Sequence, residues 1–203
     1  MADLNNPIPQ EWTSYVTQSP VALEVVPHML YDTQSYTSAT TVDLAFFTTA
    51  PANEAISDLK SPTILPNPQS FLIQAISVYF RTIPNLAATA AAQEVNDMIL
   101  LVNTGIFKLT IGQKLYGPYP LWRLPAASFV KFSPTGTFTA PLVEAYGQID
   151  GPLYPLLPNL MIAPLQNFEG HMLWPAGAVT LGAPTSPLPI QLLFDGQLAR
   201  SVQ

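Results

Sequence analysis

The stretch FLIQAISVYFRTI, Phe71 to Ile83, decides the fold class of this chain. β-Branched, aromatic and aliphatic residues dominate it, and these residue types favour β-strands. In a strand, side chains alternate between two faces, and here the apolar ones divide as follows: Leu72, Ile76, Val78 and Phe80 on one face, Phe71, Ile73, Ala75 and Tyr79 on the other. Because both faces are largely apolar, the pattern predicts a central strand that is covered on each side.

Downstream of this strand, NLAATAAAQEVNDMILLVNTG predicts a single helix over about residues 85–104. The alanine-rich beginning has high helix propensity. Val95, Met98, Ile99 and Val102 recur at helical spacing and predict one buried stripe, which we interpret as core packing. Gly105 is a plausible end of the helix, since glycine accepts the left-handed conformation common there.

After the helix, GIFKLTIGQKLYGPYPLWRLPA contains a strand, IFKLTI, with Phe107, Leu109 and Ile111 on its inward face. Gly112-Gln113 predicts a tight reversal or a bulge. The rest, rich in proline and aromatic residues, predicts a rigid loop.

Three interpretations of this loop remain open. Tyr116, Tyr119 and Trp122 could stack on sugar rings, or they could anchor a protein interface together with Arg123, since Tyr, Trp and Arg dominate binding energy at interfaces. Alternatively, Trp122 could simply plug the end of a barrel.

Further outward, the sequence predicts short strands separated by turns. Residues 1–20 are polar and proline-spaced, which predicts an extended N-terminal arm. The last strand, PIQLLFDGQLARSV, contains Asp195-Gly196, a turn or bulge signal. We therefore expect an all-β fold: a single jelly-roll β-barrel or sandwich over residues 21–203, with one inserted helix and extended termini.

The composition indicates a folded protein with an unusually neutral surface. Of the 203 residues, 48% are hydrophobic and 22 are proline, whereas only 10% are charged, against about 25% in an average soluble domain. Neutral and apolar surface is tolerated when another subunit covers it. The composition thus favours assembly, although a surface rich in Thr, Ser, Gln and Asn is the alternative.

Several functional classes are disfavoured by the sequence. The chain has no cysteine, which excludes disulfides and thiolate metal sites. We see no signal peptide in the first thirty residues and no apolar run long enough to cross a membrane. The net charge is −6 and the seven basic residues are scattered, so we expect no direct nucleic-acid binding.

No catalytic or cofactor motif stands out. His28 and His171 are the only histidines, and they lack the close spacing of a metal site; we interpret both as ordinary hydrogen-bonded residues. Glu144, Asp150 and Glu169 could form a carboxylate pair of glycosidase type, but Asp150 precedes a glycine and is better explained as a turn residue. We expect no enzyme, no metal and no cofactor.

The pattern GIFKLTIGQKLYGPYPLWRLP, following a long strand and a helix, resembles jelly-roll capsid proteins of tailless icosahedral bacteriophages with an internal membrane. It is similar in size to the small single-jelly-roll capsid proteins of Thermus phages. The resemblance covers Phe71 to Ala126 by pattern and the remainder only by composition. It implies self-association, contact with other capsid proteins, peripheral contact with an underlying viral membrane, and location in the virion after synthesis in the host cytoplasm.

Our leading hypothesis is a viral structural protein, a capsid subunit that self-assembles into an icosahedral shell through neutral, proline-rich and aromatic surfaces. The alternative is a carbohydrate-binding β-sandwich that uses Tyr116, Tyr119 and Trp122. A jelly-roll hydrolase is the third hypothesis, and it requires a carboxylate pair that the sequence does not announce.

Overall fold

The computed structural model describes seven segments of the chain: residues 8–49, 56–80, 88–124, 129–132, 143–146, 154–182 and 186–202. These segments contain ten β-strands and only a few helices, so the predicted all-β class is confirmed.

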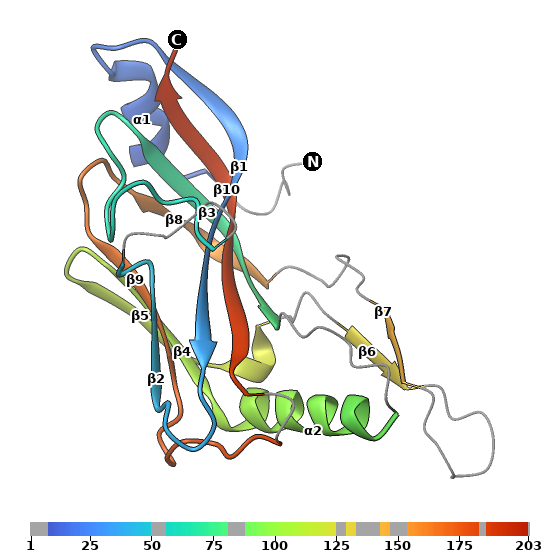
Figure 1. The fold of residues 1–203 in the computed structure, drawn as a ribbon. Helices are drawn as coiled ribbons and strands as arrows, with labels where there is room; N and C mark the ends of the chain where they lie inside the picture. Colours follow the sequence, from blue (N-terminus) through green and yellow to red (C-terminus); the bar gives the residue numbers. More distant parts are fainter. Residues whose placement is uncertain are drawn as a thin grey trace.

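Two four-stranded antiparallel sheets contain most of these strands (Figure 1). Sheet A has the order β1-β10-β3-β8, with bounds Leu23–Tyr36, Leu188–Ser201, Ser70–Phe80 and Tyr154–Ile162. Sheet B has the order β2-β9-β4-β5, with bounds Asp43–Phe46, Phe168–Leu173, Ile106–Ile111 and Lys114–Pro120. A separate pair joins β6 (Phe129–Phe132) to β7 (Val143–Tyr146). One hydrophobic cluster contains residues of both large sheets, so these pack face to face as a sandwich.

Strand β10 is hydrogen-bonded to a neighbouring strand on each side in sheet A. It pairs with β1 from Leu188 to Ser201 and with β3 on its other side. The register shifts between Asp195 and Gly196, which confirms the predicted bulge. A Cβ atom added to Gly196 would lie 1.8 Å from the backbone oxygen of Leu72, so only glycine fits at this crossing.

Strand β3 is buried along nearly its whole length and lies between β10 and β8, as its sequence predicts. The predicted division of its side chains is wrong, because a bulge at Gln74 reverses the alternation. Phe71 and Ile73 before the bulge and Ile76 after it all belong to the main core, whereas Leu72 packs elsewhere.

The N-terminal segment corrects another prediction. Instead of an extended arm, Gln10–Gln18 forms helix α1. Its Trp12 is 3% exposed and packs against Leu72 and Ala199, outside the main core. Prolines at positions 7, 9 and 20 flank this polar segment, and Trp12 is the buried residue within it, so the sequence pattern gives little sign of a helix.

Helix α2, Ala88–Thr104, confirms the predicted inserted helix within the described residues and lies across one end of the sandwich (Figure 1). The predicted stripe is partly wrong. Ile99 is 48% exposed, while Leu101 is fully buried and accepts a hydrogen bond from the Trp174 indole at 3.1 Å. Asp97 is also buried and accepts a hydrogen bond from the Gly182 N–H at 2.7 Å.

Glycine substitutions test the close crossing of β10 and β3 at Gly196. We expect Gly196→Ala to lower the free energy of unfolding by more than about 4 kcal/mol, because the clash is with backbone. Gly177→Ala is the control: its φ is +110° but nothing lies within 4 Å, so we expect a loss of about 1–2 kcal/mol. Urea unfolding measures both; equal losses would contradict the close crossing of β10 and β3.

Candidate functional site

The four candidate interface residues lie on a strand and a short helix, so the predicted rigid loop is wrong. Gly112, with φ of +60°, and Gln113 make the predicted tight reversal, and β5 follows. Tyr116 and Tyr119 lie in β5, and a single turn of 3-10 helix, η1 (Leu121–Arg123), holds Trp122 and Arg123.

The three aromatic residues do not share a face. Tyr116 pairs with Leu109 and Tyr119 with Phe107, both inward-facing residues of β4. The two tyrosines are therefore partly buried and pack against the main core. Trp122 is 61% exposed, so it is not the plug of the barrel end, and the three rings form no joint platform for a sugar.

Another tryptophan closes the sandwich beside α2. Trp174 is 2% exposed, and its ring meets that of Tyr36 edge to face at 4.6 Å between centroids. The Tyr36 hydroxyl accepts a hydrogen bond from the Val179 N–H at 2.5 Å. Trp122 and Arg123 are both exposed, whereas Trp174 is buried.

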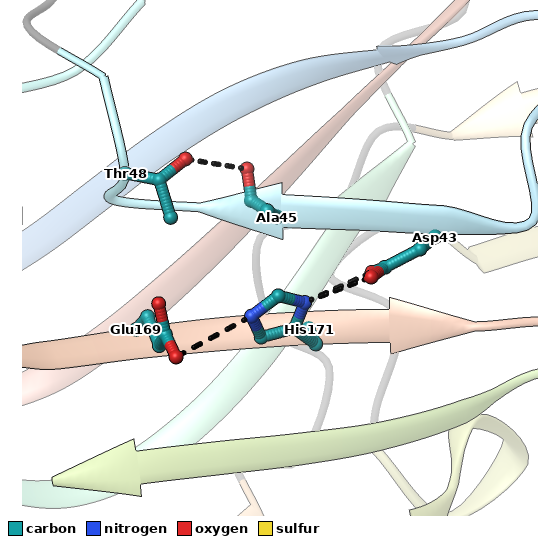
Figure 2. A network of polar contacts seen from close by, with 5 residues as sticks. All are labelled: Asp43, Ala45, Thr48, Glu169 and His171. Atoms are coloured by element: carbon teal, nitrogen blue, oxygen red, sulfur yellow. Dashed lines mark hydrogen bonds and ion pairs between the residues drawn. The ribbon is translucent and has the colours of Figure 1, made fainter.

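A polar cluster lies on the outer face of sheet B (Figure 2). His171 Nδ1 is 2.9 Å from the Asp43 carboxylate, and its Nε2 is 3.7 Å from Glu169. The Thr48 hydroxyl donates a hydrogen bond to the Ala45 carbonyl, so it is not engaged by the histidine. This cluster has a base and carboxylates but no activated nucleophile among the described residues, and it is compatible with a solvated surface network.

The other histidine holds a loop against β1. His28 Nε2 is 3.1 Å from Asp58, whose second carboxylate oxygen accepts a hydrogen bond from the Tyr31 N–H at 3.0 Å. Of the three candidate hydrolytic carboxylates, Glu169 lies beside His171, whereas the side chains of Glu144 and Asp150 lie outside the described residues.

Two acidic groups have raised pKa values and structural roles: Asp32 is buried and Asp195 is partly buried. The Asp32 carboxylate accepts hydrogen bonds from the Phe47 N–H at 2.6 Å and the Gln34 amide at 3.0 Å, and burial raises its pKa. Burial also raises the pKa of Asp195, which sits at the bulge of β10 opposite Met29 and Ala75.

One sizeable hollow was not predicted. A cavity of about 850 Å³ lies between α1, the β4–β5 reversal and β8. It is lined by Ile8, Pro9, Gln10, Glu11, Ser14, Ile111, Gln113, Lys114, Tyr116, Pro158, Asn159, Leu160, Met161 and Gln166. The sequence signal is slight: Asn159 is the only amide side chain in the uncharged run from Gly151 to Pro164.

Within the described segments, no group of three or more His, Asp or Glu residues is arranged to hold a metal ion. In the same segments, no helix has the length and hydropathy needed to cross a bilayer. No protein-family model matches the chain, and no curated protein sequence matches it.

Asp195 supplies a test by pH. Because its folded-state pKa is raised, the ionised carboxyl costs stability once the pH exceeds the ordinary value of 3.8, and this cost grows until the raised pKa is passed. We therefore expect the free energy of unfolding of Asp195→Asn, measured relative to that of the parent protein, to be higher at pH 7 than at pH 3. Urea unfolding at both pH values measures it, with Glu11→Gln, at an exposed carboxyl of α1, as control; an equal difference at both pH values would contradict the desolvation of Asp195.

Proposed function

We propose that the sandwich is a jelly roll. Numbered consecutively without β6 and β7, its eight strands have the orders 1-8-3-6 and 2-7-4-5. These orders contain the neighbours 1·8, 2·7, 3·6 and 4·5, which are the pairs of a chain folded double and then rolled up. Eight-stranded jelly rolls occur in viral capsid proteins, lectins and cupins, so the strand order alone does not choose among these functions.

We further propose that the protein is a structural subunit that self-assembles into a shell, as a viral capsid protein does. The observation that carries this proposal is the surface. Among the residues that the structure describes, eleven large apolar side chains are exposed, on a chain with only 10% charged residues: Ile8, Val21, Val25, Met29, Val42, Ile99, Leu100, Leu115, Trp122, Leu165 and Val202. Exposed apolar surface marks interaction sites when it is contiguous.

Part of this apolar surface is continuous along one strand. Val25, Pro27 and Met29 alternate outward on β1 and are all exposed. Strand β1 is also an edge of sheet A, and edge strands are places where another chain can pair or pack. This face and the region around Trp122 are the two surfaces that we propose for contact between subunits.

The partners follow from this proposal and from the resemblance to phage capsid proteins. They are further copies of the chain, other capsid proteins and, peripherally, a viral membrane; the location would be the virion. Scattered basic residues support no direct genome contact, and Arg200 is engaged by Glu24 at 2.6 Å. The carbohydrate-binding alternative lacks a joint aromatic platform, because Tyr116 and Tyr119 are partly buried and pack against the core while Trp122 is exposed.

Size-exclusion chromatography with light scattering, followed by negative-stain electron microscopy of the same fractions, tests the proposal. We expect concentration-dependent oligomers and rings, sheets or shells. A monomer at every concentration, with no assembly in the presence of co-purified virion proteins, would contradict it.

Trp122→Ala tests the proposed aromatic contact. The side chain is 61% exposed, so we expect the free energy of unfolding to change by no more than about 0.5 kcal/mol. Association should weaken at least about tenfold, because tryptophan is a frequent hot-spot residue. Sedimentation velocity measures it, with Leu165→Ala, at a side chain of equal exposure, as control; if both variants associate like the parent protein, Trp122 is not an interface residue.

A further inference from the structure

We propose that the cavity beside Asn159 is a binding groove for an uncharged, extended polypeptide segment supplied by a second copy of this chain. The choice of a second copy rests on the proposed function, whereas the binding of a peptide segment stands on the geometry of the groove itself.

The groove is built around an irregularity in β8. Ile73 pairs with Leu160, and the next pair joins Ala75 to Pro155. Between these two pairs, β3 has one residue, Gln74, whereas β8 has four, residues 156–159. Asn159 occupies this bulge and is 3% exposed. Bulges of this kind redirect a side chain away from the regular ladder.

The Asn159 amide has no hydrogen-bond partner in the described part of the molecule. Both its Oδ1 and its Nδ2 are buried and unpaired. An asparagine side chain offers two N–H donors and one carbonyl acceptor, and leaving both ends unpaired in the interior costs free energy. Natural proteins rarely retain such a group without a use for it, and this one lines the cavity between α1, the β4–β5 reversal and β8.

A peptide group is the natural complement of this amide. It presents one N–H and one C=O, so it can both donate to Oδ1 and accept from Nδ2. Because the amide atoms are covered in the free protein, Asn159 must rotate about its side-chain bonds toward the cavity when the segment enters. Glu11 and Lys114 are the only charged residues among those that line the groove, one of each sign, which favours a neutral ligand.

The shape of the groove favours a chain over a compact molecule. A second hollow of about 590 Å³ adjoins the first along α1 and shares Glu11, Ser14 and Met161 with it. The groove also runs between β5 and β8, which are the last strands of their sheets. Edge strands can accept an extended segment through main-chain hydrogen bonds.

The chain contains suitable segments. It has 22 prolines, which favour extended backbone, and the run from residue 132 to residue 143, which includes Pro134 and Pro141, contains no Asp, Glu, Lys or Arg. A neutral groove and a neutral chain match in charge.

The test uses overlapping 12-residue peptides of this chain's own sequence, each with a scrambled partner, and full-length protein as the receptor. Fluorescence polarisation measures binding to the parent protein, to Asn159→Leu and to the control Asn96→Leu, which alters an exposed amide on α2. We expect at least one peptide to bind the parent and the control, and to bind Asn159→Leu at least tenfold more weakly. We also expect Asn159→Leu to melt no lower than the parent, because it removes an unpaired buried amide.

Equal binding to all three proteins, or binding by no peptide, would overturn the proposal. A melting temperature several degrees lower for Asn159→Leu would overturn it as well, because the amide would then be paired within the chain. If Asn159→Leu does not fold, Gln113→Trp replaces it: this exposed residue of the β4–β5 reversal lines the groove, and the larger side chain should abolish peptide binding. Retained binding in that variant overturns the groove.

The outcome is separable from that of the shell proposal. A monomeric protein that binds its own peptide through Asn159 supports the groove and contradicts the shell. Shells that form equally well from Asn159→Leu contradict the groove alone.

Discussion

The antiparallel pairing of β10 with β1 and β3 is the constraint on which the rest of the structure depends. It joins the C-terminal strand to two strands from the first half of the chain, so sheet A cannot form before nearly the whole chain is present. Gly196 permits the close crossing with Leu72, and Phe194 places its side chain in the core between Leu30 and Ile76. Leu72 of β3 and Ala199 of β10 lie outside this core, and Trp12 of α1 packs against them.

The hydrophobic pattern of the sequence predicted the strands, turns and helices whose formation depends mainly on neighbouring residues. The alternation of IFKLTI, the Gly112 reversal, the long apolar strand β3 and the inserted helix α2 were all identifiable because each depends on neighbouring residues. The faces of β3 were not, because the bulge at Gln74 is imposed by pairing with β10 and β8. Likewise, the buried side of α2 is set by Trp174, 73 residues away from Leu101 in the sequence.

The candidate site was predicted less well than the fold, for the same reason. A sequence in which Tyr116, Tyr119 and Trp122 follow one another closely suggests a common surface, but the two tyrosines of β5 pack partly buried against the core, whereas Trp122 is exposed. Asn159 draws no attention in an uncharged run; its significance comes from burial without a partner and from the cavity beside it. Both properties belong to the folded chain and not to any stretch of it.

We propose that the sandwich is complete within one subunit and that association adds only to its outer surfaces, and hydrogen exchange of backbone amides, followed by mass spectrometry at low and high protein concentration, tests this. We expect peptides from β10 and β3 to exchange most slowly at every concentration. We also expect β1 and the segment containing Trp122 to become protected only at high concentration. Protection of β10 that appears only at high concentration would mean that its pairing is made between subunits, and it would contradict this proposal.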